Sequence, residues 1–195
     1  MDDEAAKIMK IIIIILAVSY GLKLWFSRGS DIYKGPGYTI KFPAGWSDYD
    51  DINPQKKKDK KFATEDKAAP KTVTYVTQEV DEDSGAFVAS MSITSMKLKS
   101  AAWIEDEWGQ IVESIRGYGN KIIDKGEIKI DGIVSRWIFY EGRPGENAVS
   151  FEFYIITEGN MFYKISYMAL KNSFDKYRKI FEASKDTIRI KQGMI

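Results

Sequence analysis

Four consecutive segments in the C-terminal half constrain the fold of this chain more than any other feature of its sequence. Each segment is rich in apolar residues and is bounded by turn sequences, which is typical of β-strands. The segments cover residues 121–130, 133–140, 148–156 and 161–170. The links between them carry the turn sequences Asp131-Gly132, Arg143-Pro144-Gly145 and Glu158-Gly159-Asn160. Because such short links cannot hold a crossover connection, the sequence predicts neighbouring antiparallel strands.

The rest of the chain predicts further strands and two helices. Alternation predicts strands over residues 38–43, 71–80 and 86–97. Helical spacing of apolar residues predicts helices over residues 100–116, with Ser100 as N-cap, and 173–186. Residues 47–70 show no sustained apolar period, and we interpret them as a long surface loop. The order of elements predicts an α+β fold, with an antiparallel sheet flanked by helices.

The alternation also predicts which side chains each strand buries. In the segment 148–156, one face carries Val149, Phe151, Phe153 and Ile155. Ser150 and Glu152 should then lie on the outside of the sheet. Arg136 alternates with the apolar residues of its own strand, so we expect a cross-strand ion pair between Arg136 and Glu152.

The N-terminal residues predict a membrane anchor. Residues 11–22 contain no charged side chain, and Lys10 and Lys23 flank them where they can reach the two interfaces. With Trp25 and Phe26 at headgroup level, about 19 residues are usable, or roughly 28 Å of helix. This is just enough to cross a bilayer. We therefore expect a tail and transmembrane signal anchor over residues 1–28, a stalk over 29–37 and one domain over 38–195.

Two other interpretations of the N-terminal segment stay open. It is a cleaved signal peptide if Ala17-Val18-Ser19 is a cleavage site, or a buried helix of a water-soluble protein. Positive charges lie on both sides of the apolar run, so their count does not decide the orientation. A span that comes after a short tail usually carries the domain behind it across the membrane. We therefore expect a single-pass protein of the cell membrane, with its domain on the extracytoplasmic side, periplasmic or lumenal.

The composition narrows the chemistry that the domain can carry out. The chain contains no histidine and no cysteine, which removes the usual general base, thiolate nucleophiles and the commonest metal ligands. Chemistry based on carboxylates, lysine or a serine–lysine pair remains possible, but no such motif stands out, so we expect no enzyme and no cofactor. With 29 basic and 28 acidic residues, the net charge of +1 gives no reason to expect nucleic acid as a partner.

Both ends of the domain resemble the PsbP-like family. Residues 37–46 read GYTIKFPAGW, similar to the opening Y-x-I-x-F-P-x-G-W of that family, and residues 158–167 followed by Phe174-Asp175-Lys176-Tyr177 resemble its closing hairpin and helix. The resemblance covers most of residues 33–190 in pattern. It implies αβα layers and a role in binding or stabilising protein partners rather than catalysis. Family members include extrinsic subunits of photosystem II and exported bacterial proteins, and a related fold binds a small GTPase. This chain departs from the photosystem subunit by its anchor and by its lack of histidine.

From these features we expect a membrane-anchored, non-catalytic accessory subunit. It would bind the bilayer and stabilise a larger membrane protein complex, with photosynthetic and electron-transfer complexes as examples. The alternative is an extracytoplasmic carrier or sensor of an apolar small molecule, held in a pocket between sheet and helix.

Candidate partner contacts lie in three places. In the anchor, small residues would permit close helix packing and a tryptophan would sit at the interface; these are Ala17, Ser19, Gly21 and Trp25. In the loop, a lysine run suits anionic headgroups or an acidic partner, unless it is simply solvated; it consists of Lys56, Lys57, Lys58, Lys60 and Lys61. Trp103 and Trp108 do not fully share a helix face, so one of them, with Trp103 as the candidate, should be exposed. The acidic turn at residues 81–83 fits a solvated hairpin tip better than a weak calcium site.

Overall fold

The computed structural model describes residues 32–53, 69–100, 102–157 and 160–191. The predicted anchor lies outside these ranges, together with its candidate contacts Ala17, Ser19, Gly21 and Trp25. The lysine run, Lys56, Lys57, Lys58, Lys60 and Lys61, lies outside them as well. Among the described residues, no helix is long and apolar enough to span a bilayer.

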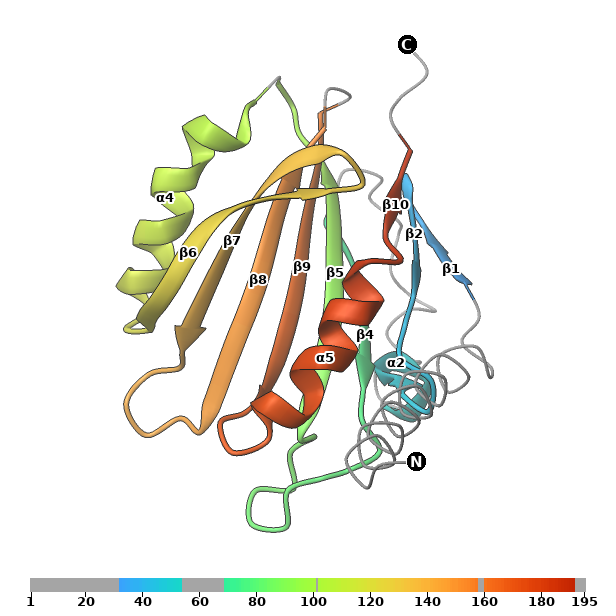
Figure 1. Cartoon of the computed structure of the whole chain (residues 1–195), viewed down its shortest axis with the longest axis vertical. Helices are drawn as coiled ribbons and strands as arrows, with labels where there is room; N and C mark the ends of the chain where they lie inside the picture. The colour runs from blue at the N-terminus through green and yellow to red at the C-terminus, as the bar shows by residue number, and fades with distance from the viewer. Residues whose placement is uncertain (1–31, 54–68, 101, 158–159, 192–195) are drawn as a thin grey trace, which may run out of the picture.

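A seven-stranded antiparallel sheet forms the centre of the molecule (Figure 1). Its strands follow the order β3 (Ser47–Asp48), β4 (Lys71–Val76), β5 (Ala89–Lys97), β9 (Met161–Leu170), β8 (Ala148–Ile156), β7 (Ile133–Glu141) and β6 (Lys121–Ile130). Asp131 and Gly132, which join β6 to β7, both have positive φ angles, as a two-residue hairpin turn requires. The four C-terminal strands and their antiparallel order are confirmed as predicted.

A second, three-stranded sheet joins the two ends of the domain. It contains β1 (Ile32–Gly35), β2 (Tyr38–Lys41) and β10 (Arg189–Ile190), with β2 in the middle. The sequence predicted one sheet and a stalk over residues 29–37, but residues 32–35 of that stretch form β1, which pairs with β2. β1 and β10 were missed because they are short and half exposed, and only pairing with β2 makes them strands.

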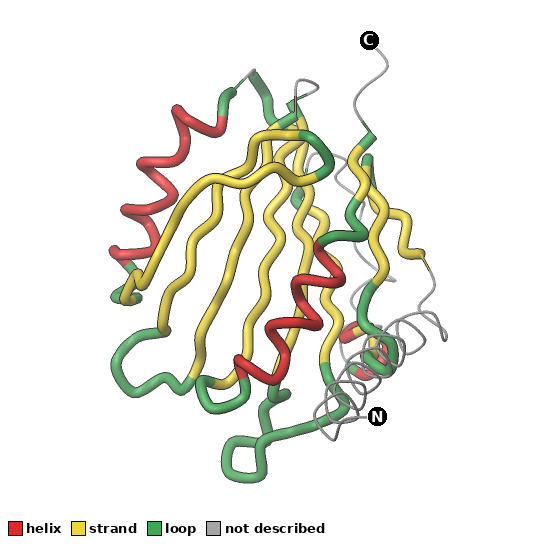
Figure 2. The backbone as a smooth tube through the Cα atoms, viewed as in Figure 1, coloured by secondary structure: helices red, strands yellow, loops and turns green. Residues whose placement is uncertain are grey.

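Two helices lie on opposite faces of the large sheet (Figure 2). Helix α4 (Ile104–Gly117) packs on β6, β7 and β8, and α5 (Phe174–Lys185) packs on the other face together with the small sheet. The predicted apolar faces are confirmed: α4 buries Ile104, Val112 and Ile115, and α5 buries Phe174, Tyr177 and Phe181. The predicted N-cap of the first helix is wrong, because α4 begins four residues after Ser100, directly behind Trp103.

The predicted loop over residues 47–70 has regular structure at its start. Ser47 and Asp48 form β3, and a single helical turn, α2 (Tyr49–Ile52), comes next. The Asp48 side chain accepts a hydrogen bond from the backbone N–H of Asp50 at 2.9 Å, which caps this turn. An acidic run therefore forms a capped turn at the edge of the sheet, which an apolar period does not reveal.

Candidate partner-binding surface

Helix α4 turns an exposed outer face to solvent. The apolar residues of α4 recur at helical spacing and turn toward the sheet, so the intervening positions face solvent. The outward positions are Asp106, Gln110, Glu113 and Gly117, and all four are exposed. We call this face, together with Trp103 before the helix and Tyr118 after it, the α4 surface.

Trp103 begins the α4 surface and leaves 65% of its area exposed. Trp108 behaves differently, because it is half-buried and its ring meets that of Tyr154 edge-on, with centroids 6.0 Å apart. The prediction that one of these tryptophans is exposed is confirmed, and the exposed one is Trp103. A large amphipathic ring in solvent is the kind of side chain that most often anchors a protein interface.

Tyr118 and Ile123 extend apolar area beyond the C-terminal end of α4. Tyr118 is 73% exposed, and Ile123 is 44% exposed. Ile123 faces solvent because the pairing of β6 with β7 shifts register between Ile122 and Asp124. This bulge was not predicted, although the adjacent Ile122 and Ile123 interrupt the alternation of a regular strand.

Carboxylates dominate the charge of the α4 surface. Glu105, Asp106 and Glu107 occupy the first turn of the helix, where its positive end favours them. Glu113 lies two turns further on, where the dipole gives no such advantage, and it pairs with Arg116 at 2.6 Å. Four acidic side chains therefore stand against a single basic one along this helix.

A buried polar cluster lies under α4. Glu152 on β8 is only 5% exposed, and its carboxylate accepts a hydrogen bond from the Tyr154 hydroxyl. It also accepts from Ser166 Oγ at 3.0 Å and from Lys164 Nζ at 3.4 Å, both on the neighbouring strand β9. The prediction that Glu152 lies outside is wrong, because α4 covers this face and the strand is buried on both sides. Tyr154 and Ile156, on the same face as Glu152, are the sequence signal that could have shown this.

The tyrosines of this cluster are held in their protonated form. Burial and the neighbouring Glu152 carboxylate raise the pKa of the Tyr154 hydroxyl well above its usual value. The same two causes raise the pKa of Tyr140. Both phenols therefore remain hydrogen-bond donors across the physiological range, and the cluster ties β8 to β9 beneath the helix.

Arg136 links α4 to the edge of the sheet. Its guanidinium Nη2 lies 3.2 Å from Glu127 Oε2 on β6 and 3.8 Å from Glu105 Oε1 on α4. The predicted pair between Arg136 and Glu152 is wrong, because Arg136 lies opposite Tyr154 in the register and Glu152 takes Lys164 as its basic partner. Arg136 instead pairs with Glu127 on β6 and Glu105 on α4.

In the acidic turn between β4 and β5, the Asp81 carboxylate is hydrogen-bonded within the turn itself. Asp81 Oδ1 accepts hydrogen bonds from Ser84 Oγ at 2.7 Å and from the Ser84 backbone N–H at 2.9 Å. These bonds lower the pKa of the Asp81 carboxyl. In the part of the chain that the structure describes, no three acidic side chains group closely enough to hold a metal ion.

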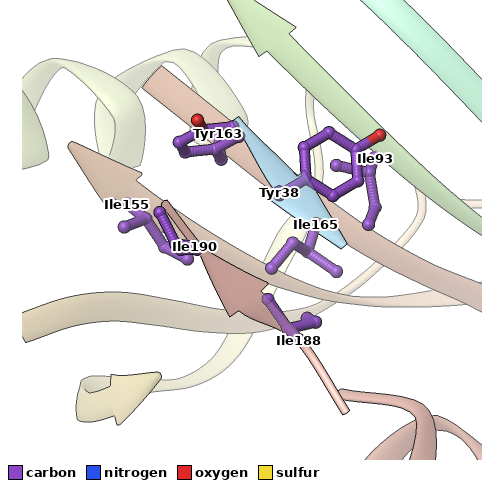
Figure 3. Close-up of a pocket in the computed structure, with 7 residues that line it drawn as sticks. All are labelled: Tyr38, Ile93, Ile155, Tyr163, Ile165, Ile188 and Ile190. Carbon is purple, nitrogen blue, oxygen red and sulfur yellow. The ribbon is translucent and has the colours of Figure 1, made fainter. Parts of the chain in front are cut away.

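An apolar recess lies between the two sheets, where Figure 3 shows its lining. Two tyrosines and five isoleucines line it: Tyr38, Ile93, Ile155, Tyr163, Ile165, Ile188 and Ile190. Its empty volume is about 180 Å³, yet its shape leaves no room for a water molecule. Pockets that bury small molecules usually measure roughly 300–1,000 Å³. This recess therefore gives no support to the alternative of a carrier for an apolar ligand.

Comparison with solved structures identifies the fold. No protein-family model matches the sequence, and no curated protein does either. The chain superposes on CyanoP, the cyanobacterial PsbP of Synechocystis sp. PCC 6803, with a TM-score of 0.51 and 12% identity, over 82% of this chain and 91% of that one. The chain has a PsbP-like fold. LpqN of Mycobacterium tuberculosis, involved in cell envelope biogenesis, gives a TM-score of 0.51 at 8% identity, over 82% of this chain and 87% of LpqN. PA94 of Pseudomonas aeruginosa, a protein of unknown function, gives 0.50 at 12% identity, over 80% and 94%.

Proposed function

We propose that this protein is a membrane-tethered, non-catalytic accessory subunit that binds a larger protein assembly through the α4 surface. The observation that carries the proposal is Trp103, with 65% of its area exposed at the start of a helix on the outside of the sheet. A PsbP-like fold is consistent with such a role, since its solved examples include a protein involved in cell envelope biogenesis.

The tether is the second part of the proposal. Residues 11–22 contain no charged side chain and precede the domain by a short stretch, so the domain would stay close to the bilayer. A tether raises the effective concentration of a partner in the same membrane, so an interface of modest area suffices. We place the domain on the extracytoplasmic side in this proposal.

Replacing Trp103 with alanine tests the binding surface. We expect Trp103→Ala to weaken association with the assembly at least tenfold, because an interface tryptophan commonly contributes about 2 kcal/mol or more. The measurement is the share of the full chain that migrates with the assembly after mild detergent extraction from native membranes.

The matched control is Lys179→Ala, an exposed position on α5 at the opposite face. This variant should migrate like the wild type, and both variants should keep the wild-type circular dichroism spectrum. A wild-type chain that migrates as a monodisperse monomer under every mild extraction condition would overturn the proposal. The tether itself fails if an alkaline wash releases the full chain from membranes.

A further inference from the structure

The outward positions of α4 point away from the described elements beneath the helix. The helix packs on β6, β7 and β8, while Asp106, Gln110 and Glu113 point to solvent. An exposed helix face flanked by two exposed aromatic side chains fits an extended or helical segment laid along it.

The charge of this face selects the kind of segment. Four carboxylates and one arginine lie along the helix. Glu113 pairs with Arg116 and Glu105 lies 3.8 Å from Arg136, so Asp106 and Glu107 make no ion pair with the described residues. An anionic lipid surface would be repelled. A lysine-rich segment would find both the carboxylates and the face of the Trp103 ring, which attracts ammonium groups.

The chain itself contains such a segment. Five of the six residues from Lys56 to Lys61 are lysines, interrupted by Asp59. The described residues on either side of it, Asn53 and Ala69, belong to the β3–β4 end of the sheet. α4 covers β6, β7 and β8, toward the other end of the strand order, and neighbouring strands are about 4.8 Å apart. One chain would have to cross β5 and β9 to bring the two together, whereas a second chain needs no such crossing.

We propose that the α4 surface binds the lysine segment, Lys56–Lys61, of a second copy of this chain. Two different surfaces meet in this contact, so it forms either once, head to tail, or twice in a reciprocal pair around a two-fold axis. Exposed ion pairs are weak and screened by salt, so the association should weaken as ionic strength rises. The membrane tether raises the effective concentration of the second copy. The inference rests on the proposed function for this tether.

The absence of cysteine from the chain allows a direct test. Two differently tagged full-length variants, Lys58→Cys and Gln110→Cys, are placed together in vesicles of neutral phosphatidylcholine and oxidised. We expect the mixed disulfide to form at least fivefold faster than either homodimer, and to be suppressed in about 0.5 M salt, which screens exposed charges. The matched control pairs Lys58→Cys with Lys179→Cys on α5, where no preference should appear.

Charge reversal separates the proposed contact from random collision. Adding Glu105→Lys, Asp106→Lys and Glu113→Lys to the Gln110→Cys variant should lower the cross-linking rate at least fivefold. Adding Lys56→Glu, Lys57→Glu, Lys60→Glu and Lys61→Glu to its partner should then restore the rate. If the triple variant does not fold, neutral replacements at the same three positions serve instead and should lower the rate as well.

Equal rates for the Gln110 and Lys179 pairs would overturn this inference, and so would an unchanged rate after charge reversal. Either result leaves the proposed function intact if Trp103→Ala still releases the chain from a larger assembly. If Trp103→Ala still migrates with the larger assembly like the wild type, while the Lys58→Cys and Gln110→Cys variants cross-link as expected, the proposed function alone is overturned.

Discussion

Two buried tyrosines of neighbouring strands differ in what their hydroxyl groups meet. The Tyr154 hydroxyl donates a hydrogen bond to Glu152, whereas the Tyr167 hydroxyl is buried and finds no partner among the described residues. Burial raises the pKa of Tyr167 far above its usual value, so the hydroxyl stays neutral but is still removed from water. A buried donor without a partner costs free energy that packing of the ring has to offset.

Replacing each tyrosine with phenylalanine should therefore have opposite effects. Tyr167→Phe removes an unpartnered hydroxyl, and we expect the free energy of unfolding to stay equal or rise by about 1 kcal/mol. Tyr154→Phe removes a hydrogen-bond donor from the buried Glu152 carboxylate and should lower the free energy of unfolding by roughly 1.5–3 kcal/mol. Urea unfolding followed by tryptophan fluorescence measures both. A clear loss of stability in Tyr167→Phe would show that its hydroxyl has a partner in solution.

At the scale of elements, the turn between β1 and β2 depends on a glycine for two reasons. Gly37 has a φ of +76°, a backbone conformation that residues with a Cβ rarely adopt. A Cβ at this position would also clash with the Tyr163 hydroxyl. That hydroxyl donates to the carbonyl of Pro36 at 3.2 Å, so the turn of the small sheet is seated on a strand of the large one. The two sheets are thus held in place by close backbone approach as well as by apolar packing.

Alanine substitution separates the two requirements. Gly132 has a similar φ of +81°, but no atom of the described residues lies within 4 Å of a Cβ at that position. Gly132→Ala should cost about 1 kcal/mol for its backbone conformation, and Gly37→Ala should cost more because it also displaces Tyr163. Adding Tyr163→Phe to Gly37→Ala should recover part of the difference in a double-mutant cycle of unfolding free energies. Equal losses for the two single variants would contradict this account.

At the scale of the whole molecule, contacts between distant segments close the layers. Glu79, in the segment after β4, accepts hydrogen bonds from Lys176 Nζ at 2.5 Å and Tyr177 Oη at 2.6 Å on α5. At the opposite end of α5, β10 pairs with β2, so the blue and red ends of the domain run side by side in Figure 1. α5 is therefore held at one end by a polar contact and at the other by strand pairing.

The Glu79 contact should contribute to the pH dependence of stability. The hydrogen bond from Lys176, and then that from Tyr177, lower the pKa of Glu79 below 4.5 in the folded protein. The unfolded state therefore binds the proton more readily, and the contribution is present above about pH 4.5 and lost as pH falls through the folded pKa. Glu79→Gln should lower stability near pH 7, with the difference shrinking as urea titrations are carried to pH values below 4.5. Glu82→Gln, in the exposed tip of the same hairpin, is the control and should leave the free energy of unfolding near pH 7 within about 0.5 kcal/mol of the wild type.

Local patterns predicted most elements of the large sheet and little of what surrounds them. Turn sequences between apolar segments placed β6, β8 and β9 at their observed boundaries, and alternation identified the face of β8 that carries Val149 and Phe153. The same reasoning misplaced Glu152, since a strand covered by a helix on its second face keeps its alternation while losing its exposed side. For the α4 surface, helical spacing separated Trp103 from Trp108, but it could not reveal Tyr118 or the bulge at Ile123.

The amino-acid sequence predicts the antiparallel order of β6 to β9, the two amphipathic helices and the chemistry excluded by the lack of histidine and cysteine. These depend on turn lengths, residue periods and composition, which are local properties. Tertiary contacts explain why residues 32–35 and 189–190 form strands, why Glu152 is buried and why Arg136 pairs with α4. Each of these features depends on which distant segment lies alongside. The residue pattern of a short polar stretch does not indicate which segment that is.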